Sequence, residues 1–270
     1  MPQHQSDFVH RTLWLRGRIG RIPPTGAMGE TMRFGDAWGS LRQAQKGKRG
    51  VSLYSRWVNR PLGRVFAAAA ASAGIGPNAV TGVSALATVA GLVVIGAVPA
   101  TVASGVAASA LLVVGFALDA ADGQVARLTG ASSRAGEWLD HVVDAGKMVG
   151  VHAAVLIGFT AGGRSGGAWM LLPLAYALVS VVLFSGLTLY ALLAPRSSAA
   201  PPPSTLRAVL LLPADYGVLA VAFVLWGTPE VFVIVYAALL LATAGVTVLL
   251  TRKWFRSLSA PIDAVSPRTF

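Results

Sequence analysis

The distribution of apolar and polar positions divides the chain into a polar first segment and a long apolar remainder. The remainder contains six apolar stretches, each close to the roughly 20 residues that a helix needs to cross a bilayer. They cover residues 79–99, 101–119, 137–160, 168–193, 208–227 and 230–250. The pattern predicts an all-α integral membrane protein with six transmembrane helices.

The residues before these stretches have a different character. Residues 1–50 contain nine basic residues and no long apolar run, which predicts a basic, partly disordered extension without a signal peptide. In residues 51–77, Arg56, Arg60 and Arg64 recur every four residues and therefore line one helical face. Aromatic and apolar residues elsewhere around this helix predict an amphipathic helix in the membrane interface. An ordinary solvated helix face is the alternative.

The same pattern predicts the organisation of the chain. The very short link at Pro99 predicts that the first two spans form a tight helical hairpin, and the Pro-rich residues 194–207 predict a loop. We expect a cytosolic extension at 1–50, an interfacial helix at 51–77, a six-helix transmembrane domain at 78–255 and a cytosolic tail at 256–270.

Charge in this chain is scarce and mostly basic. Hydrophobic residues make up 54% and charged residues 12%, with 22 Lys and Arg against 11 Asp and Glu. Such an excess is typical of nucleic-acid binding or of the positive-inside rule. Six spans place both termini on one side, which carries the basic segments, whereas the loops of the other side carry Arg164 and, at the edge, Glu230. We therefore expect cytosolic termini at a bacterial plasma membrane and no nucleic-acid partner.

Acidic residues concentrate where two consecutive spans meet. Five of the 11 acidic residues lie between positions 119 and 144. Asp119 and Asp122 share one helix face, as do Asp140 and Asp144 on the next helix. A short loop makes the helices antiparallel neighbours, so the four carboxylates converge. Each costs about 2.5–3.5 kcal/mol at membrane depth, and together they repel one another. One or two Mg²⁺ or Mn²⁺ ions are therefore expected among them.

The residues around the acids favour phosphate chemistry. Protein-bound Mg²⁺ commonly bridges carboxylates and substrate phosphates, and Arg127 is placed to bind a phosphate oxygen. Gly123, Ala126 and Gly136 are small enough for a ligand to approach the backbone. Metal-assisted phosphoryl transfer is predicted, with a carboxylate taking the proton of an attacking hydroxyl. The absence of cysteine excludes thiol nucleophiles and Cys-ligated metals.

This acidic stretch resembles the signature of the CDP-alcohol phosphotransferase (CDP-alcohol phosphatidyltransferase) family. The matching residues are Asp119-x2-Asp122-Gly123-x2-Ala126-Arg127-x8-Gly136-x3-Asp140-x3-Asp144. Members transfer the phosphoalcohol part of a CDP-alcohol to an acceptor hydroxyl, release CMP and are commonly homodimers. The resemblance extends over residues 51–255 and implies a site that opens to the cytosol.

The resemblance also implies a role for each matching residue. Asp119, Asp122 and Asp140 would bind a first metal ion. Asp140 and Asp144, with an earlier aspartate, would bind a second, and Asp144 would be the general base. The small residues Gly123, Ala126 and Gly136 would line the cytidine pocket, and Arg127 would hold the diphosphate.

The acceptor alcohol is less constrained. The commonest members use CDP-diacylglycerol with a polar acceptor such as inositol phosphate or glycerol phosphate, and we expect the same here. Other members use CDP-choline or CDP-ethanolamine with a lipid hydroxyl, and Gly136-Glu137-Trp-Leu-Asp140-His141 is similar to their pattern. Many relatives carry Arg or Lys directly after the last aspartate, where this chain has Ala145.

Three residues are candidate contacts for the acceptor. Lys147 lies one turn beyond Asp144 and would equally well compensate the charge of the acids. Arg134 precedes the third span, where a topology charge is the alternative. Asp215 is an acidic residue within the fifth span, which makes it a functional candidate by default.

Two other classes of protein place acidic residues within a membrane. Intramembrane prenyltransferases pair aspartates with Mg²⁺ and a diphosphate substrate, but the aspartates come from separated halves of a larger bundle. A divalent-cation transporter needs acids distributed along a path, whereas these cluster at one membrane face. The x8 spacing and the Gly, Ala and Arg positions favour the CDP-alcohol enzyme.

Overall fold

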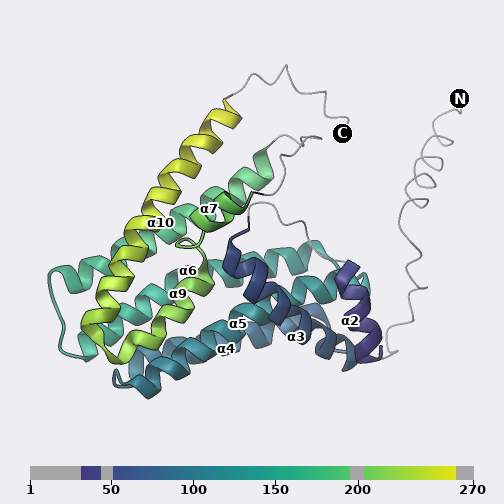
Figure 1. Ribbon diagram of the computed structural model, residues 1–270, viewed down its shortest axis with the longest axis horizontal. Coiled ribbons are helices and arrows are strands. Elements are labelled where there is room, and N and C mark those ends of the chain that lie inside the picture. The colour runs from purple at the N-terminus through teal and green to yellow at the C-terminus, as the bar shows by residue number, and fades with distance from the viewer. Residues whose placement is uncertain (1–31, 44–50, 195–203, 260–270) are drawn as a thin grey trace, which may run out of the picture. The chain divides into compact units, whose positions relative to one another are not determined.

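A computed structural model describes residues 32–43, 51–194 and 204–259, and every regular element within these ranges is a helix. The elements are α2 (Phe34–Gln43), the π-helical turn η1 (Ser55–Asn59), α3 (Arg60–Ser72), α4 (Pro77–Ala97), α5 (Val102–Thr129), α6 (Arg134–Ala161), α7 (Ala168–Leu193), α8 (Thr205–Leu210), α9 (Tyr216–Ala222), the 3₁₀ helix η2 (Phe223–Gly227) and α10 (Pro229–Leu258). Helix α5 is central, since α3, α4, α9 and η2 all pack against it (Figure 1). The predictions for residues 1–31, 44–50, 195–203 and 260–270 lie outside the described residues.

Five of the helices are long and apolar enough to cross a membrane: α4, α5, α6, α7 and α10. Their outward-facing side chains are apolar and recur at helical spacing. On α7, for example, Leu171, Leu174 and Leu178 are each more than half exposed. A water-soluble protein rarely exposes apolar surface of this extent. These features indicate an integral membrane protein.

The predicted span at 208–227 does not form one continuous helix. The chain turns after α8, and α9 begins only at Tyr216, where the Asp215 side chain accepts a hydrogen bond from the Gly217 amide at 2.8 Å. Pro213, which has no amide hydrogen to donate, lies in this turn. Beyond the turn, the chain continues as a shorter apolar piece, Tyr216–Gly227. Apolar composition predicted a membrane span at this segment but not its interruption.

Short connections join α4 to α5 and α5 to α6, and α4 packs against both of the other helices. Helix α4 packs along α5, which confirms the predicted hairpin, and Thr101 and Ser104 form a capping box at the start of α5. At the other end of α5, Gly130 adopts a left-handed conformation with φ of 69°, a position that favours glycine. Ser133 then caps α6 by accepting from the Gly136 amide. The acidic ends of α5 and α6 are therefore held close together.

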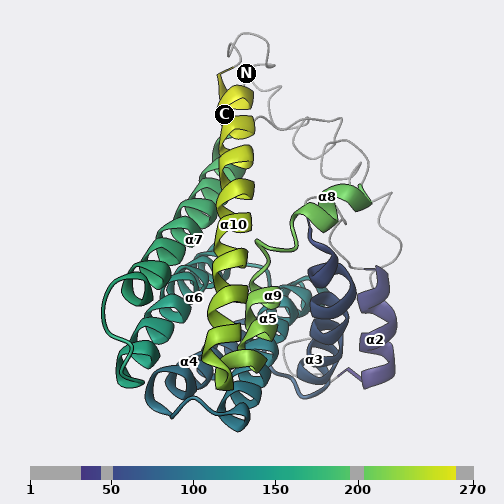
Figure 2. The ribbon, with the colours of Figure 1, turned by 60° about the vertical axis from the view of Figure 1, so that its left-hand side comes forward.

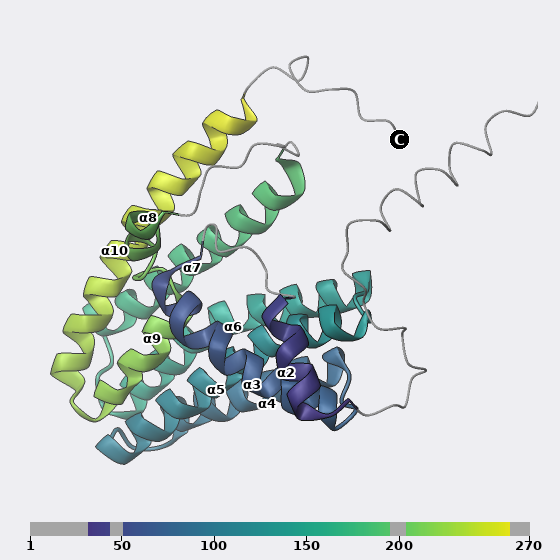
Figure 3. The same cartoon turned by 45° about the vertical axis from the view of Figure 1, so that its right-hand side comes forward.

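Small residues allow α3 to lie directly against α5. Ala67, Ala68 and Ala71 pack with Ala121 and Val125 in a buried cluster. A Cβ atom at Gly63 would lie 2.9 Å from the Ala117 carbonyl oxygen, so the two backbones are in close contact, as is common between membrane helices. Helix α2 covers the other side of α3 (Figures 2 and 3). It lies within the segment for which the sequence predicted a partly disordered extension.

An aromatic core fills the end of the bundle away from the acidic residues. Phe223, Phe232 and Tyr236 are fully buried there, and Trp226 is 2% exposed. Nearby, His152 contacts the Tyr236 hydroxyl at 2.5 Å and the Ser180 hydroxyl at 2.9 Å. Both ring nitrogens therefore have partners, as buried polar groups require. This packing ties α6, α7 and α10 together and fixes the helices that carry the site.

Candidate active site

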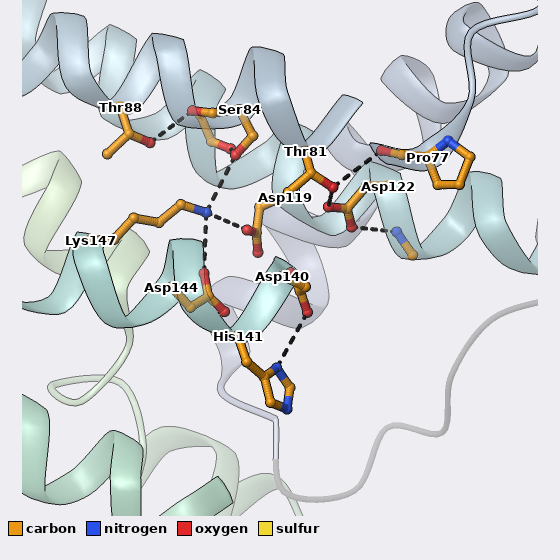
Figure 4. A network of polar contacts seen from close by, with 12 residues as sticks. Pro77, Thr81, Ser84, Thr88, Asp119, Asp122, Asp140, His141, Asp144 and Lys147 are labelled. Atoms are coloured by element: carbon orange, nitrogen blue, oxygen red, sulfur yellow. Dashed lines mark hydrogen bonds and ion pairs between the residues drawn. The ribbon is translucent and has the colours of Figure 1, made fainter. Parts of the chain in front are cut away.

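Three carboxylates meet where the facing ends of α5 and α6 approach each other (Figure 4). Asp119 comes from α5, and Asp140 and Asp144 come from successive turns of α6. One oxygen from each lies within 4.8 Å of the others. The predicted convergence of the two helix faces is confirmed for these three residues. Side-chain exposure falls from 35% at Asp140 to 26% at Asp144 and 14% at Asp119, so the cluster opens on the Asp140 side.

Asp122 lies outside this group of three. It is 6% exposed and turns toward α4, where it accepts a hydrogen bond from the Thr81 hydroxyl at 2.5 Å and another from the Gly123 amide. Sequence reasoning assigned no role to Thr81. The sequence does contain a pattern that indicates a polar helix face here, because Thr81, Ser84 and Thr88 recur at helical spacing in an otherwise apolar span. These three residues form the inner, polar face of α4.

Lys147 places a positive charge inside the acidic cluster. Its ammonium nitrogen contacts Asp119, lies 3.2 Å from Asp144 and lies 3.3 Å from the Ser84 hydroxyl (Figure 4). Its side chain is only 3% exposed. The sequence predicted that Lys147 either binds the acceptor or compensates the charge of the acids. These contacts are those of charge compensation. His141 approaches Asp140 at 3.7 Å and is well exposed.

The small residues of the motif lie beside the carboxylates, on the side of the α5–α6 link. A Cβ atom at Gly123 would lie 3.2 Å from Nη1 of Arg127. At Gly136 it would lie 3.1 Å from the Asn78 side-chain oxygen. Arg127, Ala126 and both glycines are half-buried. The first residue of α6, Arg134, is exposed.

The pattern of the CDP-alcohol phosphatidyltransferase family matches residues 75–250, which include α4 to α9, η2 and most of α10. The chain belongs to this family. Its members are phosphotransferases of phospholipid synthesis that use CDP-alcohol substrates. No curated protein resembles the chain closely enough to serve as a relative for comparison.

The acidic group fits the divalent metal that is typical of this family. Carboxylate oxygens are the ligands that hard cations such as Mg²⁺ and Mn²⁺ prefer. Three such side chains from two helices, with oxygens within 4.8 Å of one another, make a donor set of the right chemistry. Asp119, Asp140 and Asp144 are therefore the residues that would hold a metal ion.

The segment predicted to lie in the membrane interface, residues 51–77, packs its charged side inward. The Arg64 guanidinium lies 5.3 Å from the centre of the Trp38 ring, and the Arg60 carbonyl accepts from the Gln124 side chain. Burial, and then the neighbouring Arg56, lower the pKa of the Arg60 guanidinium. The outer side exposes apolar residues, with Trp57 at 76%. This distribution is typical of a helix lying against lipid.

Asp215 joins this interfacial segment to α9. Its carboxylate accepts hydrogen bonds from Ser52 and from Ser55, the latter at 2.6 Å, in addition to the Gly217 amide. Nearby, Tyr54 stacks on Phe116 with ring centres 6.5 Å apart. Burial, and then the charge of Asp215, raise the pKa of the Tyr54 phenol. The Asp215 carboxylate therefore binds groups of the protein itself.

Replacing Asp215 by alanine is expected to destabilise the protein by about 0.5–2 kcal/mol, the usual cost of losing a helix cap, and to loosen the interfacial segment. Asp215→Asn is the matched control, since asparagine caps helices equally well, and its NH₂ group, in place of the second carboxylate oxygen, can donate to the serine hydroxyls instead of accepting from them. Thermal unfolding in detergent and the KM for the acceptor distinguish the roles. An Asn variant of normal stability with a raised acceptor KM would instead make Asp215 an acceptor contact.

A cavity of about 230 Å³ lies beside the acidic group, among α5, α6, α7, α9 and α10. Its polar groups come from Asp215, Tyr216, His152, Ser180 and Thr243. The rest of the lining is mainly apolar, as is common in sites for small molecules. A lipid chain would find a compatible surface here, whereas a highly charged group would not.

Proposed function

We propose that the protein transfers a phosphatidyl group from CDP-diacylglycerol to the hydroxyl of a polar alcohol, such as inositol phosphate or glycerol phosphate, and releases CMP. The observation that carries this proposal is that Asp119, Asp140 and Asp144 converge in space. All three belong to the motif of the family that the chain matches. In the reaction, the acceptor oxygen forms a bond to the phosphorus next to the lipid. The bond from that phosphorus to the oxygen bridging it to CMP breaks.

The side chains around the acidic group have distinct roles in this proposal. The Asp144 carboxylate takes the proton from the acceptor hydroxyl as the new bond forms. The Arg127 guanidinium binds oxygens of the diphosphate. Gly123, Ala126 and Gly136 leave room for the cytidine part against the backbone.

The metal-binding residues of the proposal are the four aspartates, with Asp122 next to the group of three. A bound Mg²⁺ or Mn²⁺ ion would neutralise charge on the diphosphate and polarise its phosphoryl oxygens. Two ions are the number that the family resemblance implies. Asp122 also orients the start of α4 through Thr81, which lies 2.5 Å from it.

A second candidate is transfer of a CDP-choline- or CDP-ethanolamine-type headgroup to a lipid hydroxyl. Two observations favour it. Lys147 and Asp215, both candidate acceptor contacts, bind protein groups. The cavity beside the acids is lined mainly by apolar side chains, which suit a lipid acceptor better than a sugar phosphate. Arg134, the remaining candidate acceptor contact, is a cation and favours a phosphorylated acceptor.

We propose six membrane crossings, with both termini and the active site in the cytosol. Arg164, in the α6–α7 link, pairs with Glu230 at the start of α10 at 3.4 Å. Helices α7 and α10 therefore begin at the same end of the bundle. The chain between the end of α7 and the start of α10 must therefore run back along the length of the bundle. Helices α8, α9 and η2 would form this interrupted crossing. The basic residues beside the acidic group, Arg127 and Arg134, support a cytosolic location for the other end of the bundle, which carries the active site.

We also propose that the interfacial helix lies against lipid, and that the protein is a homodimer, as family members commonly are. For the segments of the chain, we propose the boundaries predicted from the sequence, including a basic extension at 1–50 and a tail at 256–270. The exposed Trp57 side chain supports the interfacial placement, because tryptophan favours the headgroup region.

The proposal predicts that CMP is released only when donor, acceptor and divalent metal are all present. The purified protein is supplied with Mg²⁺ or Mn²⁺, with CDP-diacylglycerol or CDP-choline, and with inositol phosphate, glycerol phosphate or diacylglycerol. Release of CMP from CDP-diacylglycerol with a polar acceptor supports the first candidate, and release from CDP-choline with diacylglycerol supports the second. EDTA should abolish either reaction, and Mn²⁺ should restore it. Release of pyrophosphate from an added prenyl diphosphate, with no CMP from either CDP-alcohol, would show a prenyltransferase.

A further inference from the structure

The buried Lys147 ammonium has all three of its hydrogen-bond donors satisfied within the protein. A lysine ammonium carries three N–H groups and accepts none. The partners are Asp119, Asp144 at 3.2 Å and Ser84 at 3.3 Å. The Ser84 hydroxyl itself donates to the Gly115 carbonyl at 2.8 Å, so its oxygen is free to accept from Lys147. The ammonium is therefore a built-in member of the acidic cluster.

Lys147 is also much less exposed than the three acids of the cluster. It follows Asp144 by three residues, about 4.5 Å further along α6, and its side chain is 3% exposed, compared with 35% for Asp140 at the open side. A lysine near a helix end usually turns its charge toward the interface. Here the ammonium instead lies buried, in contact with Asp119 and Asp144. A buried charge without partners is expensive, so the ammonium stays with Asp119 and Asp144.

The charges of the site set how many further cations it accepts. When ionised, Asp119, Asp122, Asp140 and Asp144 carry four negative charges, all within or beside the cluster. Lys147 and one divalent ion bring three positive charges, whereas Lys147 and two divalent ions would bring five. Like charges at such short distances repel strongly. A second divalent ion would therefore have to weaken the contacts of the ammonium with Asp119 and Asp144.

We infer that Lys147 occupies the position of one cation, so that the substrate-free protein binds a single divalent ion. A second ion would join only together with the diphosphate of the donor, whose negative charges offset it. This inference rests on the metal-binding part of the proposed function and not on the identity of the donor or acceptor.

The test counts Mn²⁺ ions on the full chain in detergent, without substrate, by electron paramagnetic resonance of free Mn²⁺. The wild type is expected to bind one ion per chain. Lys147→Met, which keeps the length of the side chain without its charge, is expected to bind a second ion or to bind Mn²⁺ at least tenfold more tightly. Lys253→Met removes an exposed lysine of α10 and is expected to match the wild type. Adding CDP to the wild type should bring in the second ion.

Two ions on the substrate-free wild type, or identical binding by the wild type and Lys147→Met, would overturn the inference. If the methionine variant does not fold, the wild-type count decides the question alone. A protein that binds one Mn²⁺ but releases no CMP from any donor keeps this inference and loses the proposed activity. A protein that binds no Mn²⁺ loses both.

Discussion

Asp144→Asn is expected to lower CMP release by about 10²- to 10⁴-fold, the usual contribution of a general base, while the protein remains folded. Asparagine has nearly the same shape as aspartate, but its amide is no base. The Asp144 side chain is 26% exposed, so an acceptor hydroxyl can reach it, and Asp119 remains to hold Lys147. The measurement is the initial rate of CMP release at saturating Mg²⁺, together with the unfolding temperature in detergent.

Glu137→Gln is the matched control, because it makes the same change from acid to amide on the same helix. Glu137 is exposed in the first turn of α6 and lies outside the group of three carboxylates. Its variant should retain most of the activity. An Asp144→Asn enzyme with a near-normal rate would remove Asp144 as the base and leave only a structural or metal-binding role.

Gly115→Val is expected to destabilise the protein by about 1–3 kcal/mol, the usual cost of overpacking, and to abolish activity. A Cβ atom at this position would lie 2.6 Å from the Thr88 hydroxyl and 3.2 Å from the Ser84 carbonyl oxygen. Helix α4 would have to move away from α5. Ser84 would then lose its bond to the Gly115 carbonyl, and Thr81 would move from Asp122. Thermal unfolding and CMP release measure the two effects.

Gly82→Val is the control for this change, because it adds the same side chain to α4. Gly82 is exposed, and no heavy atom lies within 4 Å of a Cβ atom built there. Its variant should unfold at the wild-type temperature. Equal stability of both valine variants would contradict the close contact of α4 and α5 at Gly115.

The sequence predicted most of the membrane helices, because a crossing helix has to be long and apolar whatever its neighbours are. It also predicted the α4–α5 hairpin and the short α5–α6 link. The predicted span at residues 208–227 differed from the structure. Its composition is as apolar as that of the other spans, but Pro213 and the cap at Asp215 divide it. Whether such a break persists depends on the partners of Asp215, which come from residues 52 and 55, far away in the sequence.

The acidic site shows the same division between local and tertiary information. Helical spacing placed Asp119 and Asp122 on one face, but residues three apart differ by about 60° around the helix. That difference is enough for Asp119 to meet α6 while Asp122 meets Thr81 on α4. Local spacing cannot tell which neighbouring helix each carboxylate faces.

By itself, the sequence determined the residue types and spacing of the family motif, the apolar spans and the concentration of acids at one helical connection. These follow from periodicity and from the cost of placing charge in lipid, which are properties of the chain alone. Only the tertiary structure decided that Lys147 lies between Asp119 and Asp144 with Ser84 as its third partner. The physical reason is that a buried charge takes its partners from whichever helices pack around it, and α4 contributes Ser84 from 63 residues away.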